Sequence, residues 1–120
     1  MIEFEVPVRL VSLLNAREHY MARARRAKTQ RTAAHTIARA HVSGLVNTPL
    51  SITVTITRIA PRELDDDNLA GSAKHIRDGI ADALGIDDRD KRVQWRYEQA
   101  KFTGAARGGY SCAVRIEVRA

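Results

Sequence analysis

Four stretches of this chain alternate between apolar and polar residues, and two longer stretches with helical spacing separate the first three of them. The clearest alternation covers residues 51–57, where isoleucine and valine are interleaved with serine and threonine. Similar runs occupy residues 2–10, 93–97 and 112–118. A period of two places the apolar side chains on one face of a strand, so each run is expected to cover a core on one side. Pro7 favours an edge position for the first strand, because proline cannot donate to a neighbouring strand.

The first helical stretch covers residues 20–42 and is rich in alanine and arginine. Its small and apolar side chains form one stripe, which permits close packing. The stripe consists of Tyr20, Ala24, Ala27, Ala34, Ile37 and Ala38. The second stretch, residues 68–84, has apolar residues at spacings of three and four. Asp67 or Asn68 is expected to be its N-cap, and Gly85 is expected to end it.

These elements follow one another in the order β-α-β-α-β-β, which predicts the α+β class. One mixed or antiparallel sheet of about four strands, covered by two helices, is the economical arrangement. With 120 residues, the chain is expected to form a single domain over 1–120. No apolar run approaches the roughly 20 residues of a membrane span, and a signal peptide is not apparent, so we expect a soluble, cytoplasmic protein without a membrane partner. Cys112 is expected to be a small buried residue.

The charge is distributed unevenly along the chain. The net charge is +6, yet most acidic residues lie between Glu63 and Asp90, so the flanking segments are more basic than the total suggests. A dense basic segment neutralises phosphates and releases counterions on binding, which favours a polyanion as the partner. A solvated basic helix is the alternative for the same segment. The residues expected to contact nucleic acid are Arg17, Arg23, Arg25, Arg26, Lys28, Arg31 and Arg107.

Three consecutive aspartates, Asp65 to Asp67, follow the clearest strand and precede the second helix. On an extended backbone, residues i and i+2 project to the same side, so Asp65 and Asp67 can face one divalent cation while Asp66 points the other way. The alternative is a capping turn with surplus charge. Against that alternative, three adjacent carboxylates repel one another unless a cation or a basic partner offsets them. A second acidic run at residues 87–90 has the corresponding alternative of a helix-to-strand turn.

Four motifs lie in a defined order along the chain. They are Ser12 with Asn15, L-D-D-D-N-L at 64–69, K-H-I-R-D-G-I at 74–80 and G-I-D-D at 85–88. Together they resemble the RusA-type Holliday junction resolvases, especially the phage-encoded ones, over most of the chain. The resemblance implies a RusA-like fold and a bacterial or phage-encoded, metal-dependent endonuclease that resolves four-way DNA junctions in recombination and repair. It also implies Mg²⁺ as the cofactor, with Mn²⁺ as a substitute.

The same resemblance assigns roles to individual residues. It implies that the catalytic residues are Asp65, Asp67, Asp88 and Lys74, and that the metal ligands are Asp65, Asp67, Asp87 and Asp88. About three extra residues precede Lys74 compared with the family pattern, and three residues turn a helix by about 300° and advance it by about 4.5 Å. An ordinary ion pair with Asp78, four residues further along the helix, is the alternative role for Lys74.

The length of the second helix bears on how the two acidic runs meet. A helix over residues 68–84 spans about 25 Å, whereas the four residues after it reach back at most about 14 Å. Asp67 and Asp88 of one chain are therefore not expected to share a metal ion. Two copies related by a twofold axis, with these helices antiparallel, place the first acidic run of one chain near the second run of the other. We therefore expect a homodimer with composite active sites.

The expected reaction is hydrolysis of a phosphodiester in branched DNA. The metal ion orients and helps to deprotonate a water, Lys74 stabilises charge on the phosphate, and the basic residues hold the DNA backbone without reading sequence. Arg31 lies on the apolar stripe of the first helix, so it either snorkels or reaches the acidic site. Trp95 and Tyr97 are expected in the core, with base stacking as the alternative. Two other functions remain open, namely a catalytically silent DNA-binding phage regulatory protein and a broader flap-directed or RNA-directed nuclease.

Overall fold

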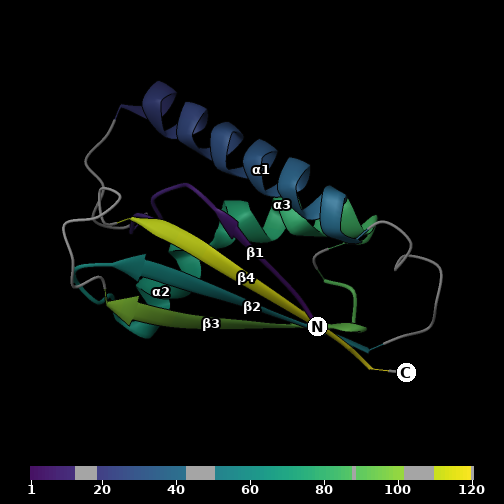
Figure 1. Cartoon of the computed structure of the whole chain (residues 1–120). Helices are drawn as coiled ribbons and strands as arrows, with labels where there is room; N and C mark the ends of the chain where they lie inside the picture. Colours follow the sequence, from purple (N-terminus) through teal and green to yellow (C-terminus); the bar gives the residue numbers. More distant parts are fainter. Residues whose placement is uncertain (13–18, 43–50, 88, 102–109, 120) are drawn as a thin grey trace.

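The alternating stretches form one mixed four-stranded sheet in the computed structural model of the chain (Figure 1). The structure describes residues 1–12, 19–42, 51–87, 89–101 and 110–119. Its strands are β1 (Ile2–Val6), β2 (Ser51–Ala60), β3 (Val93–Lys101) and β4 (Ser111–Arg119). Its helices are α1 (Tyr20–Val42), α2 (Asp66–Ser72) and α3 (Lys74–Leu84). The predicted α+β class and four-stranded sheet are confirmed, but the described residues contain three helices where two were expected.

The strands lie in the order β1-β4-β2-β3. β4 is antiparallel to both neighbours, while β2 and β3 are parallel and are connected through α2 and α3. β1 is an edge strand, as Pro7 predicted. It ends at Val6 and not near residue 10, because Pro7 has no N–H to donate and the N–H of Val8 turns back to the Val6 carbonyl at 2.8 Å.

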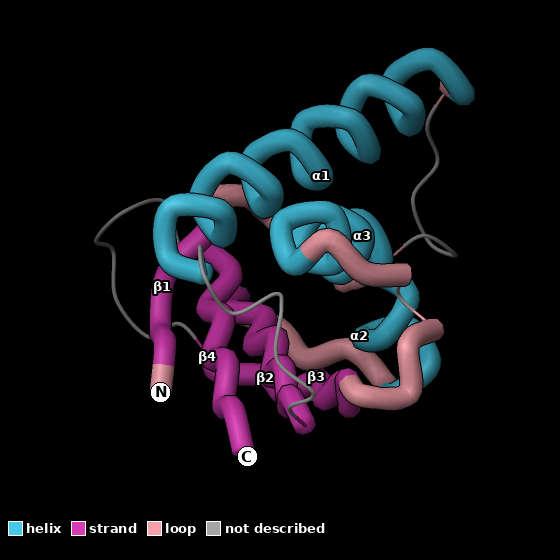
Figure 2. Tube along the Cα trace, turned by 90° about the vertical axis from the view of Figure 1, so that its right-hand side faces the viewer, coloured by secondary structure: helices cyan, strands magenta, loops and turns pink. Residues whose placement is uncertain are grey.

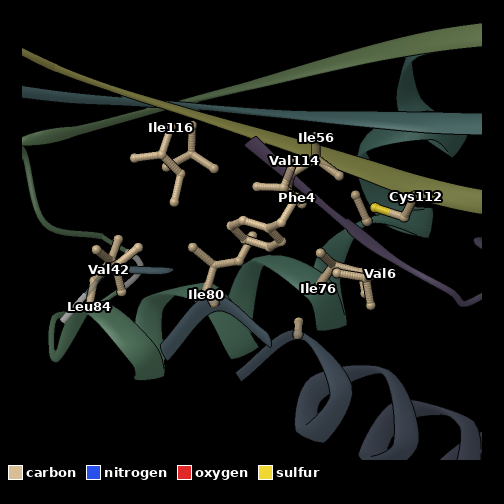
Figure 3. Packing of buried hydrophobic residues seen from close by; sticks show 14 of the residues in the cluster. Phe4, Val6, Val42, Ile56, Ile76, Ile80, Leu84, Cys112, Val114 and Ile116 are labelled. Atoms are coloured by element: carbon tan, nitrogen blue, oxygen red, sulfur yellow. The ribbon is translucent and has the colours of Figure 1, made fainter. Parts of the chain in front are cut away.

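The core lies between the sheet and the helices α1 and α3, and Figure 3 shows apolar side chains of both layers gathered there. Gly79 of α3 lies where α1 packs against it. A Cβ atom at this position would lie 2.4 Å from the Arg31 carbonyl oxygen and 2.8 Å from Cβ of Ala34, so only glycine permits this approach. Cys112 is fully buried in β4, and this burial raises the pKa of its thiol to about 12, which confirms its predicted role as a small buried residue.

The second helical stretch is broken into two helices. The single helix predicted for residues 68–84 is wrong in this respect, because α2 ends at Ser72 and α3 begins at Lys74. The hydroxyl of Ser72 donates to the Leu69 carbonyl at 2.7 Å, and the N–H of Ala73 turns back to the Ala70 carbonyl at 3.2 Å. Such local bonds compete with the regular helical pattern. Gly85 ends α3 in the left-handed conformation, with φ 70°, as predicted.

α1 has the predicted bounds, but its fully buried residues all lie between Gln30 and Val42. The buried residues of this helix are Gln30, Ala34, Ala38 and Val42. Tyr20 was expected on the packed stripe, yet it is 72% exposed. The reason is length, since 23 residues form a helix of about 35 Å and the 11 residues of α3 one of about 16 Å. Figure 2 shows the N-terminal end of α1 projecting beyond α3.

Trp95 and Tyr97 of β3 are half-buried and pack against the core, as predicted. Arg77 of α3 connects them: its guanidinium lies 4.9 Å from the Trp95 ring centroid, and its Nη1 donates to the Tyr97 hydroxyl at 2.9 Å. These contacts fix β3 to α3. Among the described helices, none combines the length and the apolar composition that crossing a membrane requires.

Candidate active site

The first acidic run lies at the carboxyl end of β2, and Gln99 of β3 fixes the segment that leads into it. The N–H of Leu64 donates to Oε1 of Gln99 at 2.8 Å, and Nε2 of Gln99 donates to the Leu64 carbonyl at 2.7 Å. This pair of hydrogen bonds holds the backbone immediately before Asp65 against the neighbouring strand. Gln99 carries no recognisable motif, so sequence reasoning did not identify it.

Asp65 is the N-cap of α2, a position that the sequence assigned to Asp67 or Asn68. Its backbone is extended, with φ −69° and ψ 168°, and its Oδ1 accepts a hydrogen bond from the Asn68 N–H at 2.9 Å. Nδ2 of Asn68 also lies 3.0 Å from both carboxylate oxygens. The hydroxyl of Ser12 donates to Oδ1 of Asn68 at 2.6 Å. Ser12, Asn68 and Asp65 therefore form one connected network.

The extended backbone expected through Asp67 is wrong, because the helix begins at Asp66 and not after the acidic run. Asp65 is extended whereas Asp67 lies in the first turn of α2, so the spacing rule for strands does not apply to this pair. Asp66 and Asp67 are exposed in the first turn of α2, and neither side chain makes a hydrogen bond or ion pair to another described residue. Their charges are favourable at the positive end of the helix.

The second acidic run forms the helix-to-strand turn that was the alternative for it. Oδ1 of Asp87 accepts from the Arg89 N–H at 2.8 Å and lies 3.6 Å from Nε of Arg89. Both oxygens of Asp90 contact the Arg92 guanidinium, at 3.1 and 2.9 Å, and Oδ1 also accepts from the Arg92 N–H. These hydrogen bonds from Arg92 lower the pKa of Asp90 to about 2. Asp88, expected to be catalytic and a metal ligand, lies outside the described residues.

The two acidic runs lie at opposite ends of the sheet. The first follows the end of β2, whereas Asp87 precedes the start of β3, and these strands are parallel neighbours (Figure 1). Ten residues of strand span roughly 30 Å, so one chain does not bring the runs together. This separation agrees with the expectation from helix length. Within the described segments, no group of three or more His, Cys, Asp or Glu side chains is placed to hold a metal ion.

Lys74 is the first residue of α3 and is exposed. The break at Ala73 means that α2 and α3 do not form one straight helix, so the expected rotation of 300° does not apply to the position of Lys74. The ion pair with Asp78, which was the alternative role for Lys74, is not formed in the described part of the chain. Lys74 thus stands just after α2 with its ammonium group in solvent.

The basic residues of α1 differ in what they contact. Arg23, Arg25 and Lys28 are exposed on the projecting half, whereas Arg26 is half-buried. Nε and Nη2 of Arg31 bind both carboxylate oxygens of Asp82 in α3, at 2.7 and 3.0 Å. This hydrogen bonding lowers the pKa of Asp82. Arg17 and Arg107 lie outside the described residues.

Sequence reasoning also missed a cavity of about 320 Å³ beside the acidic run. It is lined by three arginines, Arg9, Arg58 and Arg62, and by residues next to Asp65 in the chain or connected to it, including Ser12 and Leu64. We call it the arginine cavity. A signal was present in the sequence, because Arg58 takes the inward position that follows Ile52, Val54 and Ile56 in the alternation of β2.

Comparison with known proteins gives a relative but no activity. No model of a known protein family matches the sequence. An uncharacterized protein of Xylella fastidiosa (strain Temecula1) is 45% identical over 82 residues, which cover 62% of this chain and 52% of the relative. The chain thus spans about half the length of that relative.

Proposed function

We propose that this protein is a metal-dependent endonuclease of the RusA type that cleaves branched DNA, with the four-way junction as its substrate. One observation carries the proposal. Ser12 and Asn68 belong to two motifs of the resemblance that are 56 residues apart in sequence, and their side chains meet at 2.6 Å and orient the carboxylate of Asp65. A surface turn with no role beyond capping has no need for a partner from so distant a segment.

The donor set at this end of the sheet suits Mg²⁺ or Mn²⁺. Both metals prefer oxygen ligands, and the exposed carboxylates of Asp66 and Asp67 have no competing cation among the described residues. Asp65 and Asp67 would hold the ion, and Asn68 would fix the orientation of Asp65. When bound, the ion supplies Lewis-acid activation of the scissile phosphate and of a water. The exposed Lys74 is available to stabilise negative charge on that phosphate.

The second acidic run enters the proposal through a second copy of the chain. Asp87 lies roughly 30 Å from the first run along the sheet of its own chain, so it can complete a site only in a partner. A homodimer with two composite sites suits a four-way junction, which requires two cuts. The partner's Asp87 would need to exchange its contacts with Arg89 for the metal ion, namely a hydrogen bond of 2.8 Å from the Arg89 N–H and an ion pair of 3.6 Å.

The projecting half of α1 supplies the surface for DNA. Its first turn contains no acidic residue, and Arg23, Arg25 and Lys28 are exposed. Cations on a helix that projects from the molecule can contact phosphates that lie beyond the reach of a flat surface. Such contacts position the backbone without reading sequence.

One observation favours a second candidate, a DNA-binding protein without catalysis. Asp65 already caps α2 through the Asn68 N–H, so this carboxylate has a structural role in the absence of any metal. In that case, the acidic run only starts a helix, and the basic half of α1 binds DNA alone.

Cleavage assays on a substrate panel separate these candidates. The wild-type protein is incubated with four-way junctions, flaps, linear duplex and RNA, with Mg²⁺ and with EDTA. We expect paired nicks in the junction that require Mg²⁺. Asp67→Asn should reduce cleavage by at least about 100-fold and leave junction binding unchanged, whereas Glu98→Gln, which removes an exposed charge from β3, should do neither. Unchanged cleavage by Asp67→Asn contradicts the assignment, and binding without cleavage by the wild type favours the second candidate.

A further inference from the structure

A buried arginine in β2 breaks the apolar pattern of the strand. Arg58 follows Ile56 on the inward side and pairs in register with the fully buried Cys112 of β4. Only 7% of Arg58 is exposed. Arginine is almost never buried to this extent unless a carboxylate or another anion pairs with it.

The partners of the Arg58 guanidinium are neutral. Its Nε donates to the Leu10 carbonyl at 3.0 Å, and its Nη1 donates to the Arg62 carbonyl at 2.6 Å. In the described part of the chain, no carboxylate pairs with it. Two of its five N–H donors are thus bonded to described residues, and none of these residues supplies an anion for its positive charge. Burial lowers the pKa of Arg58, which the charge of Arg9 lowers further and Tyr110 partly offsets.

The arginine cavity lies directly in front of this guanidinium and carries further positive charge. Arg9 and Arg62 line it together with Arg58, and Glu63 is the single acidic residue among the described residues of its lining. The Arg9 guanidinium lies over the Tyr110 ring, 4.1 Å from its centroid, and this cation–π contact between two lining residues fixes the arginine. A volume of about 320 Å³ equals roughly ten waters, enough for a phosphate group and part of a sugar.

The cavity is adjacent to the candidate active site. Leu64 lines it and immediately precedes Asp65, and Ser12 lines it while donating to Asn68, the residue that orients Asp65. We propose that the arginine cavity binds a backbone phosphodiester of the nucleic-acid strand on which the acidic run acts. The inference rests on the proposed function for the identity of the ligand, but the buried cation predicts an anionic ligand independently of any cleavage.

Binding without divalent metal tests this proposal separately from catalysis. In EDTA, the Nε–Hε resonance of Arg58 is followed by NMR while inorganic phosphate or a short single-stranded DNA is added, and affinity for the DNA is measured by fluorescence anisotropy at several salt concentrations. Both ligands should shift the Arg58 resonance, and the DNA should do so at a far lower concentration. If inorganic phosphate binds as tightly as the DNA, the ligand is free phosphate, and the nucleic-acid assignment is overturned.

Substitutions of the two exposed arginines that line the cavity test the proposal without changing the buried Arg58. Arg9 and Arg62 are exposed, so the double substitution Arg9→Gln with Arg62→Gln should fold. We expect it to weaken DNA binding about tenfold at low salt, to reduce the salt slope by about 1, and to abolish the Arg58 shift. The control Arg96→Gln removes an exposed cation from β3, away from the cavity, and should change affinity less than twofold. Equal losses in both variants, or an Arg58 resonance that no ligand shifts, overturn the proposal.

The outcomes for the cavity and for the nuclease are distinguishable. If the wild type binds DNA through the cavity but cleaves no junction with Mg²⁺, the nuclease proposal fails and the phosphate site stands. If the wild type cleaves and the double variant of Arg9 and Arg62 binds and cleaves equally well, the cavity proposal fails and the nuclease stands.

Discussion

The two acidic runs look alike in the sequence but differ in how their charges are balanced. In the second, Asp87 contacts Arg89, and Asp90 is held by the guanidinium and the N–H of Arg92. In the first, the partner of Asp65 is the neutral Asn68, and Asp66 and Asp67 have no partner among the described residues. A carboxylate that an arginine already neutralises gains little from a metal ion, whereas an unbalanced cluster gains much. The first run is therefore the better candidate for cation binding.

The largest expected effect on stability comes from the capping role of Asp65. Asp65→Ala removes the acceptor for the Asn68 N–H and should lower the free energy of unfolding by about 1 kcal/mol. Asp67→Ala removes only a favourable charge near the helix start and should cost about 0.3 kcal/mol. Urea unfolding of the two variants in EDTA measures the difference. Equal losses would show that Asp65 is not distinguished from its neighbours by capping.

A smaller effect is expected at the second run, where lowering the pH should remove the contribution of Asp90 to the stability of the fold. The pKa of Asp90 is lowered from 3.8 to about 2 in the folded protein, chiefly by the side-chain hydrogen bond from Arg92. Because the folded value is the lower one, the stabilisation is fully present above pH 3.8 and is lost as the pH falls towards 2.

Asp90→Asn tests this dependence, because it removes the charge and retains an acceptor oxygen. The difference in unfolding midpoint between wild type and Asp90→Asn should be constant above pH 3.8 and should shrink between pH 3.8 and about 2. Thermal unfolding at a series of pH values measures it. A difference that stays constant throughout this range would contradict the proposed balance of charge by Arg92.

The sequence predicted the elements well where a pattern was long. Both bounds of α1 agree with the structure, and each alternating run contributes a strand to one sheet. The break at Ala73 was missed because Ser72 and Gly71 are tolerated inside helices, and the bonds from Ser72 to the Leu69 carbonyl and from Ala73 to the Ala70 carbonyl become visible only in the structure. The exposed half of α1 was missed because periodicity describes a stripe but not the length of the layer beneath it.

The candidate site was predictable in its position but not in its local geometry. The place of the first acidic run after β2 follows from the alternation before it. The relative orientation of Asp65 and Asp67 could not be predicted from the alternation, because it depends on a helix that begins two residues earlier than expected. Arg58 could have been identified, since a charge at an inward position of a clear strand is an exception that needs a partner. Gln99 could not, because its role depends on the parallel register of β2 and β3.

Binding of Mn²⁺ to the first acidic run can be followed by NMR, since the ion broadens the amide resonances nearest to it. We expect substoichiometric Mn²⁺ to broaden the amides of Asp65 to Asn68, Asp67→Asn to abolish this broadening and Asp90→Asn to preserve it. Broadening confined to the second acidic run, or broadening at the first run that Asp67→Asn leaves unchanged, would contradict the assignment of the first acidic run as the metal site.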